Sequence, residues 1–302
     1  MNFKYKYKIV SVDHFKDLKE DIDKLYRENK LSDNETYRKY LSTKKFEIPE
    51  DFPNATSLIV MAIFTRLVRV NFLLDGKKYE IMIPPQYYDD GLEFEDVENV
   101  IMKYIIKDPN YKIKLATHLH LKLLAARSGL GKYGRNNICY VDEMGSFITL
   151  IAYYTDFPFK EDNWNDIEMM DVCKNCTICM NTCPTGAIST SPEENFVIDA
   201  GKCITLYNEI DGPFPQWISL KAHNSLKGCM KCQLPCPANR EVIKKTLNFE
   251  DIQEQETRMI LEGNADEELL NSLAKKLKMV YPSNAKEEFP ILKRNLEVLI
   301  KQ

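Results

Sequence analysis

Cysteine is the residue type in this chain whose number and spacing most clearly predict a chemistry. Eight of the nine cysteines fall between Cys173 and Cys236. The first group reads C-x2-C-x2-C-x3-C-P and ends at Pro184, and the second reads C-x2-C-x3-C-P and ends at Pro237. A triplet of closely spaced thiolates followed by Cys-Pro is typical of iron–sulfur ligands, whereas structural zinc sites use cysteine pairs. The pattern therefore predicts iron–sulfur clusters in preference to zinc.

The cysteine that precedes each proline is expected to bind the cluster that its neighbours do not bind. This crossover occurs in two-cluster ferredoxins, and proline turns the chain away while removing one backbone N–H. The rule divides the eight cysteines into two sets of four with none left over. The first set is Cys173, Cys176, Cys179 and Cys236, and the second set is Cys183, Cys203, Cys229 and Cys232. We therefore expect two 4Fe–4S clusters, carried by a bacterial ferredoxin-like module.

The ninth cysteine, Cys139, stands apart from the others. It lies in the alternating segment 137–141, with no cysteine or histidine close to it in the sequence. Free cysteine is commonly a small buried hydrophobic residue. We interpret Cys139 as an inert buried thiol, with a ligand or a nucleophile as the alternative.

A second segment with ligand-binding chemistry is the glycine-rich run from Gly129 to Asn136. Glycines interleaved with cations can bring backbone N–H groups and positive charge against a phosphate or an amide-rich ligand. The spacing imitates a dinucleotide motif, but that motif follows a strand and precedes a helix, and here the order is reversed. We therefore predict a ligand loop without NAD, and the alternative is a helix end followed by a tight turn. The candidate cofactor-binding residues are Gly131, Lys132, Tyr133, Gly134, Arg135 and Asn136; no catalytic residue is assigned.

Composition limits the classes of protein that the chain can belong to. Its 302 residues, 44% of them hydrophobic, suit about two globular domains. The net charge of −4 gives no general attraction to nucleic acid or to an anionic membrane. No apolar run approaches the roughly 18–20 residues that span a bilayer, and no signal peptide is evident. We expect a cytoplasmic protein with no membrane partner, and so many thiolates also suit a reducing cytosol.

Hydrophobic periodicity predicts the elements that must position these residues. Before the cysteines, we expect helices at 11–30, 36–41, 94–107 and 115–128 and strands at 55–64, 68–74, 79–83, 137–141 and 146–154. Asp75-Gly76 between two of these strands suits a two-residue hairpin turn. Short helices are expected at 251–262, 266–277 and 285–300. The predicted organisation is an α/β or α+β N-terminal domain over residues 1–156, a double-cluster module over 157–245 and a helical tail over 246–302.

Several motifs together resemble the epoxyqueuosine reductase family. They are the run Gly129–Asn136, the segment Glu143–Phe147, the first cysteine group with its following Thr-Gly-Ala-Ile, and the segment Gly228–Pro237; Phe52–Val60 also resembles an early strand of that family. The resemblance implies an N-terminal α/β domain that holds cobalamin against the second cluster, so that electrons reduce the cobalt. In that family, cobalt(I) chemistry removes the epoxide oxygen from a modified base in tRNA. Reductive dehalogenases resemble the same architecture and act on organohalides.

The chain departs from the family pattern at the position of the general acid. The resemblance places the family's Asp at Leu115, its Pro at His118 and its Glu at Leu121. His118 or His120 could replace the acid, because histidine transfers protons near neutral pH. The helical repeats that contact tRNA in longer members are reduced to a short tail, so we expect tRNA not to be a partner. These departures indicate a diverged paralogue.

The sequence thus supports two functional hypotheses. In the first, the chain is an oxidoreductase whose two 4Fe–4S clusters feed electrons to a cobalamin-type cofactor held by the N-terminal domain. In the alternative, it is a non-catalytic electron-transfer protein that reduces a partner such as a corrinoid protein. Both require an external electron donor, and both allow a small-molecule or corrinoid partner.

Overall fold

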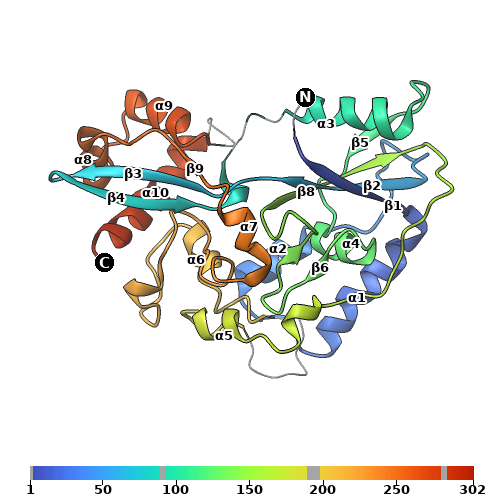
Figure 1. The fold of residues 1–302 in the computed structure, drawn as a ribbon, viewed down its shortest axis with the longest axis horizontal. Coiled ribbons are helices and arrows are strands. Elements are labelled where there is room, and N and C mark those ends of the chain that lie inside the picture. Colours follow the sequence, from blue (N-terminus) through green and yellow to red (C-terminus); the bar gives the residue numbers. More distant parts are fainter. Residues whose placement is uncertain (1–2, 89–90, 92, 189–197, 280–283) are drawn as a thin grey trace. The chain divides into compact units, whose positions relative to one another are not determined.

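The computed structural model describes residues 3–88, 91, 93–188, 198–279 and 284–302 (Figure 1). The chain folds into two compact units that are interleaved along the sequence. Unit 1 comprises Met1–Phe64, Gly91–Cys176 and Ser189–Gly201, and unit 2 comprises Thr65–Asp90, Thr177–Ile188 and Lys202–Gln302. The predicted division into 1–156, 157–245 and 246–302 is continuous along the chain, and as a division of function it stays a prediction.

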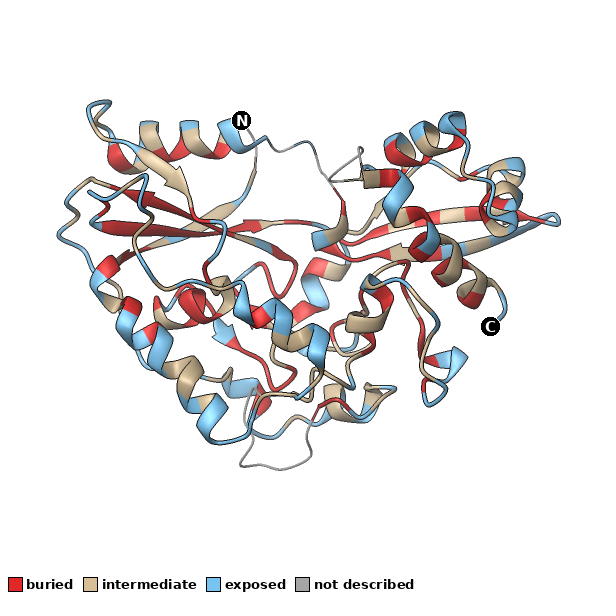
Figure 2. Cartoon of the chain, turned by 180° about the vertical axis from the view of Figure 1, so that it is seen from behind, coloured by how far each residue is buried: buried red, intermediate tan, exposed pale blue. Residues whose placement is uncertain are grey.

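Unit 1 is built on a four-stranded antiparallel sheet. Its order is β1 (Tyr5–Ser11), β2 (Ser57–Phe64), β8 (Ile148–Thr155) and β5 (Ile113–Leu115). After Ser57, strand β2 is a continuous apolar run, and all but the last residue of the strand are buried. Such a run suits a central strand that is covered on both faces. The sheet therefore has a core on each side, as the red strands in Figure 2 show.

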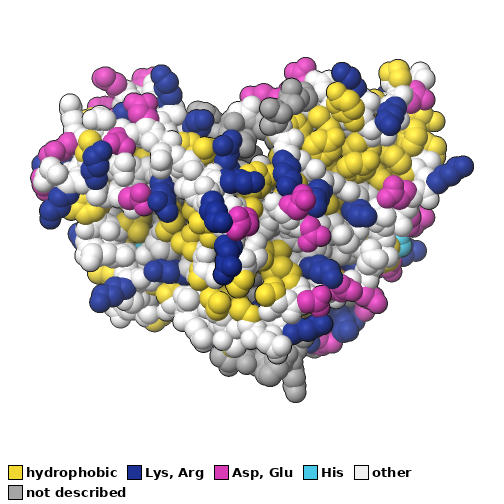
Figure 3. Space-filling model, in the orientation of Figure 1, with side chains coloured by type: hydrophobic (Ala, Val, Ile, Leu, Met, Phe, Trp, Pro, Cys, Tyr) yellow, Lys and Arg dark blue, Asp and Glu magenta, His cyan; other side chains and the backbone are white. Residues whose placement is uncertain are grey.

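Helices cover both faces of this sheet. Helices α1 (Phe15–Arg27) and α4 (Leu121–Arg127) pack on the face that carries Leu58 and Val60. Helix α3 (Phe94–Val100), continued by a π-helical segment Ile101–Ile106, packs on the opposite face. Beside it, hydrophobic side chains reach the surface around α3 and the start of β1 (Figure 3). The mixed α/β architecture predicted for the N-terminal part is confirmed.

The remaining elements of unit 1 are short. They are the 3-10 turn Val12–His14, α2 (Glu35–Ser42), the hairpin strands β6 (Lys132–Tyr133) and β7 (Cys139–Tyr140), and the 3-10 turn Asp171–Cys173. The prediction of one helix over 115–128 is wrong in its first half. Leu115 pairs with Tyr153 at the sheet edge, and the helix starts only at Leu121. Strand pairing at the sheet edge therefore overrides the helical spacing of the apolar residues.

Unit 2 is built on a three-stranded sheet. Strands β3 (Val68–Leu74) and β4 (Lys77–Ile83) form the predicted hairpin, and β9 (Leu247–Asn248) adds to β3 in parallel. Asp75 and Gly76 have φ angles of 51° and 70°, as a type I′ turn requires. The hairpin shares its core with the C-terminal helices α8 (Glu254–Glu262), α9 (Glu267–Lys276) and α10 (Ala285–Ile300).

The cysteine-bearing part of unit 2 has little regular structure. Its elements are α5 (Ile178–Thr182), α6 (Ile204–Glu209), α7 (Arg240–Ile243) and the 3-10 turns Leu220–Ala222 and Pro237–Asn239. A further 3-10 turn of unit 2, Pro85–Tyr87, follows β4. The local core of the cysteine-bearing part is small and is centred on Ile204, Ile218 and Ala222. A segment with so few apolar contacts suits a module that folds around inorganic centres. Among the described residues, none of the helices has the length and apolar character that crossing a bilayer requires.

Candidate iron–sulfur centres and glycine-rich loop

The second predicted set of cysteines lies wholly within unit 2. Cys203 stands at the N-terminus of α6, and Cys183 follows α5 directly. The thiol of Cys203 interacts electrostatically with the thiols of Cys229 and Cys183. Chain segments far apart in the sequence thus bring these thiols into one neighbourhood, and this donor set suits an iron–sulfur cluster.

Two thiols of this set, those of Cys203 and Cys229, lie in a desolvating environment. Burial raises the pKa of Cys203 to about 11, against hydrogen bonds from Thr205 that favour the thiolate. Burial also raises the pKa of Cys229, against hydrogen bonds from Asn224 and from the Lys231 backbone. A buried thiol that already has hydrogen-bond donors is prepared to bind a cationic metal centre as a thiolate.

The first predicted set is divided between the two units, with Cys173 and Cys176 in unit 1 and Cys179 and Cys236 in unit 2. Its local elements agree with the role that the motif assigns to proline. Cys236 caps the 3-10 turn Pro237–Asn239, and proline is well placed at the first position of a helix, where its missing N–H costs nothing. The ligand partition itself stays a prediction.

No disulfide joins any of the nine cysteines, all of which the structure describes. Within the described ranges, no group of three or more histidine, cysteine or carboxylate side chains forms a site for a single metal ion. A cubane does not require such a site, because each of its thiolates binds a different iron, whereas zinc holds all of its sulfur ligands at about 2.3 Å.

The segment before Cys229 is shaped by close packing. Gly228 has a φ of 61°, and a Cβ at this position would lie 2.7 Å from the ring of Tyr87. Asn208 donates to the carbonyl of Gly228 at 2.7 Å. Only glycine fits here, because the backbone is left-handed and an aromatic ring covers it.

The glycine-rich run forms a helix end and a short hairpin. Gly129, with a φ of 68°, follows α4, and β6 and β7 then pair with Tyr133 opposite Cys139. A Cβ at Gly131 would lie 2.6 Å from the Cys139 sulfur, and one at Gly134 would lie 2.6 Å from the Tyr140 ring. The glycines are therefore needed for tight packing, as the alternative interpretation of this run proposed.

The candidate ligand residues of the loop are mostly turned inward. Gly131, Tyr133, Gly134, Arg135 and Asn136 are buried, and Lys132 is exposed. The N–H groups of the first three donate to the backbone carbonyls of Ala125, Glu168 and Ile138. The loop therefore offers a ligand the Lys132 side chain, which pairs with Glu168 at 2.5 Å, rather than a cradle of vacant N–H groups.

Arg135 contributes to the first cysteine group instead of facing outward. Its guanidinium is 8% exposed and donates to the carbonyl of Cys173 at 2.8 Å. Asn136 donates to the hydroxyl of Tyr140 at 3.0 Å and closes the hairpin. Arg135 thus links the glycine-rich loop to the backbone of a predicted cluster ligand.

The candidate replacements for the missing acid do not share a helix. His118 and His120 both precede α4, so the prediction that they lie within one helix is wrong. Burial, with Lys122 and Lys44 nearby, lowers the pKa of His120 to about 4. At neutral pH His120 is therefore uncharged, so it has no imidazolium proton to donate, and with so low a pKa it is also a weak base. Leu115, where the family resemblance places the Asp, has a hydrocarbon side chain packed against the core under α3.

Cys139 is a buried thiol, as predicted. It is 3% exposed, and burial raises its pKa to about 12. Such a thiol is not ionised near neutral pH and is a poor nucleophile.

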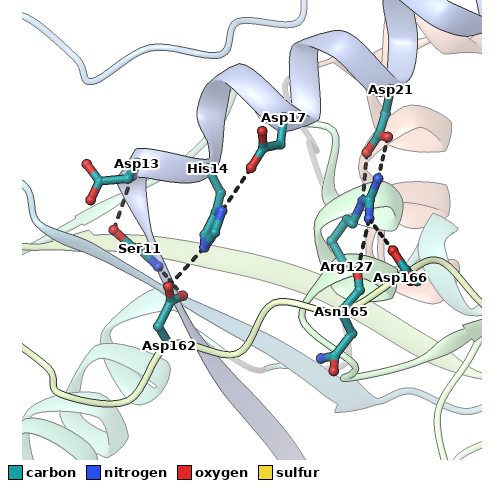
Figure 4. A network of polar contacts seen from close by, with 9 residues as sticks. All are labelled: Ser11, Asp13, His14, Asp17, Asp21, Arg127, Asp162, Asn165 and Asp166. Atoms are coloured by element: carbon teal, nitrogen blue, oxygen red, sulfur yellow. Dashed lines mark hydrogen bonds and ion pairs between the residues drawn. The ribbon is translucent and has the colours of Figure 1, made fainter.

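A polar network fixes α1 and the end of α4 to the segment 162–166 (Figure 4). Arg127 forms an ion pair with Asp21 and donates to the carbonyl of Asn165 at 3.1 Å. His14 contacts Asp17 at 3.0 Å and Asp162 at 2.9 Å, one carboxylate on each ring nitrogen. Because Arg127 is two residues before Gly129, this network sets where the glycine-rich loop begins.

Comparison with known protein families decides the nature of the cysteine module. The family described as "4Fe-4S double cluster binding domain" matches residues 172–239, from one residue before Cys173 to beyond Cys236. Residues 172–239 form a 4Fe–4S double cluster binding domain. Its presence supports the prediction of two 4Fe–4S clusters and confirms the ferredoxin-like part of the predicted fold class.

Curated relatives confirm the family resemblance. Epoxyqueuosine reductase of Bacillus subtilis is 31% identical over 155 residues, covering 51% of this chain and 38% of its own length. The Escherichia coli protein of the same name is 36% identical over 118 residues, which are 39% of this chain and 29% of that protein. The Bacillus cereus protein is 27% identical over 247 residues, which are 80% of this chain and 60% of that protein. The matched part of the chain thus spans between about a third and three fifths of these relatives.

Solved structures show the same fold. The epoxyqueuosine reductase of Streptococcus thermophilus aligns with a TM-score of 0.63 at 19% identity, covering 98% of this chain and 76% of that one. Another epoxyqueuosine reductase, crystallised with an epoxyqueuosine-modified tRNA stem loop, aligns with a TM-score of 0.66 and covers the same shares.

This second structure corrects our expectation about tRNA. We expected no tRNA partner because the C-terminal tail is short. A protein of the same fold has nevertheless been crystallised with a tRNA stem loop, and this chain covers 76% of it. The short tail is therefore no ground for excluding tRNA.

The structure also shows polar residues near the thiols that the motif search missed. Thr185, Thr205 and Asn224 lie beside Cys183, Cys203 and Cys229. Two of them had a local signal, because Thr185 and Thr205 each stand two residues after a cysteine. Asn224 had no such signal, since four residues of irregular chain lie between it and Cys229.

Proposed function

We propose that this chain is an iron–sulfur oxidoreductase that passes single electrons through its two 4Fe–4S clusters to a cobalamin-type acceptor. The observation that carries the proposal is the 4Fe–4S double cluster binding domain at residues 172–239, joined to an α/β unit of the fold found in epoxyqueuosine reductases. The clusters supply one-electron transfer at potentials set by their surroundings.

Residues of unit 2 prepare the second cluster site. Cys183, Cys203, Cys229 and Cys232 supply the thiolates, and burial raises the pKa of two of them, Cys203 and Cys229. The Tyr87 ring covers Gly228 and so fixes the backbone that enters Cys229. Arg135 holds the Cys173 backbone in unit 1. These residues position the thiolates and need not move during electron transfer.

The support for a cobalamin-type acceptor is the family resemblance. The loop residues available to such a ligand are fewer than the sequence indicates, because Arg135 and Asn136 hold the protein's own backbone and side chains. Lys132 is the exposed cation of the loop. We assign it the contact with a polar group of the ligand.

The substrate class in this proposal is a nucleic acid with a modified base. It is supported by the relatives named epoxyqueuosine reductase and by the structure of one with an epoxyqueuosine-modified tRNA stem loop. The reaction would be reductive removal of the epoxide oxygen, in which two electrons, delivered singly by an external reductant, and two protons give an alkene and release the oxygen as water.

The test begins with protein purified under argon. We expect about eight irons per chain, which follows from two cubanes, and a change in the corrinoid absorption spectrum on adding cobalamin. Lys132→Glu should weaken cobalamin binding without changing the iron content. Lys174→Glu is the matched control, because Lys174 is also exposed and is ion-paired, with Asp171 at 2.7 Å. Absence of iron, or equal cobalamin binding by the Lys132 variant and the control, would contradict the corresponding part of the proposal.

One observation favours the alternative of an electron-transfer protein without chemistry of its own. The position of the family's acid carries Leu115, and His120 nearby in the sequence has a pKa of about 4. In this case the protein would reduce an added corrinoid protein but would not turn over an epoxyqueuosine-containing stem loop. Turnover of the stem loop with dithionite and cobalamin would reject the alternative.

A further inference from the structure

Hydrogen-bond donors are arranged around the thiols of the second cysteine set. The clearest is the side-chain amide of Asn224, whose Nδ2 lies 3.1 Å from the sulfur of Cys229. This is well within the distance at which sulfur accepts a hydrogen bond. Both residues belong to unit 2.

The orientation of this amide follows from its other partners. Its oxygen, Oδ1, accepts the backbone N–H of Met230 at 2.7 Å. Its nitrogen also donates to the carbonyl of Ala222 at 3.1 Å. An N–H group and a carbonyl together leave one assignment for the amide, because oxygen cannot donate and nitrogen cannot accept. The Asn224 nitrogen must therefore face the Cys229 sulfur.

Two threonines stand in a similar relation to two other thiols of the set. The hydroxyl of Thr185 lies 3.7 Å from the sulfur of Cys183. Thr205 stands at the same place after Cys203, and hydrogen bonding by its backbone N–H and hydroxyl opposes the rise in the pKa of that thiol. In each case the threonine follows the cysteine by two residues, so the turn that begins at the cysteine brings the hydroxyl back to the sulfur. Once the sulfur is a thiolate bound to iron, it can only accept, and the hydroxyl must donate.

The Asn224 segment is held by a second layer of buried polar groups. Asn208 is fully buried, and it donates to the Gly228 carbonyl and contacts His223 Nδ1 at 3.0 Å. Asn295 of α10 donates to the carbonyls of Asn208 and Leu226 at 2.9 and 2.8 Å. The segment 222–229 is thus tied at several points, and the donor on Asn224 is held in place without help from the metal.

Hydrogen bonds to cluster sulfurs affect the reduction potential in a definite direction. Reduction adds one negative charge to the cluster, and this charge is shared with the thiolate sulfurs. A donor aimed at a thiolate therefore stabilises the reduced form more than the oxidised form, which raises the potential.

We propose that the side chains of Thr185, Thr205 and Asn224 donate hydrogen bonds to the thiolates of Cys183, Cys203 and Cys229 and raise the reduction potential of the second cluster. They are positioning and tuning residues rather than catalytic ones. The inference rests on the proposed function only in requiring that the second cluster is present.

The test is a potentiometric titration of the anaerobic holoprotein followed by electron paramagnetic resonance. Asn224→Leu removes the donor at nearly constant volume and should lower the potential of one cluster while the other stays unchanged. Asn224→Asp keeps an acceptor for the Met230 N–H but replaces the donor with a carboxylate, so it should lower the same potential further. Thr185→Val and Thr205→Val should each shift the same cluster in the same direction.

Thr182→Val is the matched control for the threonine variants. Thr182 is next to Cys183, but its hydroxyl donates to the carbonyl of Ile178 at 2.9 Å and also approaches that of Cys179. This variant should leave both potentials at their wild-type values. A shift in Thr182→Val as large as in Thr185→Val would overturn the proposal, since the effect would then not come from the thiolate contact.

The outcomes separate this proposal from the proposed function. If the wild-type protein lacks the second cluster, the proposed function fails first. If both clusters are present and the Asn224 variants leave their potentials unchanged, the tuning role is wrong and the proposed function stands. Loss of the second cluster in both Asn224 variants would also overturn tuning, because Asn224 would then serve assembly of the site.

Discussion

At the scale of single residues, environment decides what each titratable group can do. Cys139 and Cys203 are both cysteines whose pKa is raised by burial, to about 12 and about 11. Only Cys203 has hydroxyl and N–H donors beside its sulfur and other thiols nearby. The difference between an inert thiol and a cluster ligand therefore lies in the neighbours of the sulfur.

Replacing Cys203 with Ser tests this difference. We expect the variant to lose the second cluster and to retain about four irons, since one cubane remains. Cys139→Ala is the matched control and should keep about eight. Iron analysis gives the iron content of each variant, and electron paramagnetic resonance shows which clusters remain. Two intact clusters in Cys203→Ser would show that the ligand partition is wrong.

His14 provides a pH-dependent contribution to stability. Burial lowers its pKa, but hydrogen bonds and attraction from Asp17 and Asp162 outweigh this effect, and the net pKa is raised. A raised pKa means that the folded state binds the proton more tightly than the unfolded state. The contribution is therefore complete below the unfolded value of about 6.5 and is lost as the pH rises through the folded value.

His14→Gln is the variant that measures this contribution. Its thermal midpoint should fall furthest below that of the wild type near pH 5.5, and the gap should narrow by pH 8.5. Thermal unfolding of both proteins across this range checks the sign. A gap that is constant or that widens with pH would mean that the ion pairs with Asp17 and Asp162 contribute nothing.

At the scale of elements, glycine placement and apolar packing decide whether the loops and helices can form. Gly131 is needed because strand β7 passes directly behind it, with the Tyr140 carbonyl 2.8 Å from where a Cβ would be. A carbonyl in a paired strand cannot move aside as a flexible side chain can. The same loop carries the exposed Lys132, so its conformation bears on ligand binding.

Gly131→Ala should therefore destabilise the protein by about 1–3 kcal/mol through overpacking. Lys132→Ala, at the next position, is the control and should cost at most about 1 kcal/mol, because it removes only an exposed ion pair. Chemical denaturation measures both values. Equal stability of the two variants would show that β6 and β7 separate easily.

The helices of unit 2 surround an apolar cavity of about 330 Å³, lined in part by Leu273, Leu277 and Phe289. Leu273 is 1% exposed. Truncating it to Ala enlarges the cavity and should cost about 2–5 kcal/mol. Leu220→Ala, at a site that is 53% exposed, should stay within about 0.5 kcal/mol. Chemical denaturation of the two variants compares the free energy of unfolding lost in the core with that lost at the surface. A small loss in Leu273→Ala would mean that the helices close around the space that the side chain leaves.

At the scale of the whole molecule, the two units have different sources of stability. Unit 1 has a central strand whose residues from Leu58 to Ala62 are fully buried. The cysteine-bearing part of unit 2 relies on the small core of Ile204, Ile218 and Ala222. Such a segment depends on its metal centres, because cluster binding and folding are coupled.

Removing the clusters with an iron chelator under anaerobic conditions should affect the two regions unequally. We expect amides in residues 202–236 to lose protection from hydrogen exchange, while those of β2 and β8 keep it. Exchange measured by mass spectrometry on holo and apo protein gives the comparison. Equal protection of residues 202–236 in both forms would show that this segment folds without metal.

Much of this protein could be predicted from local sequence. The cysteine spacing predicted the double-cluster domain, because the turns between neighbouring ligands involve only two or three residues. Asp75-Gly76 predicted the hairpin, and the periodicity of 285–300 predicted a helix with the bounds of α10. In each case the cause lies within a few residues of the effect.

Other features were decided by tertiary structure. Leu115 begins a segment whose apolar residues have helical spacing, but it pairs with Tyr153 at a sheet edge. The hairpin β3–β4 precedes most of unit 1 in sequence but packs with the C-terminal helices. Arg135, which the sequence predicts in a ligand loop, donates to the Cys173 carbonyl from a distant segment. Asn224 meets Cys229 only because a buried polar framework folds the irregular segment between them. Spacing along the chain determines which cysteines can bind iron. Contacts between distant segments determine the burial and the hydrogen bonds around those cysteines, to which we assign the reduction potential of the second cluster.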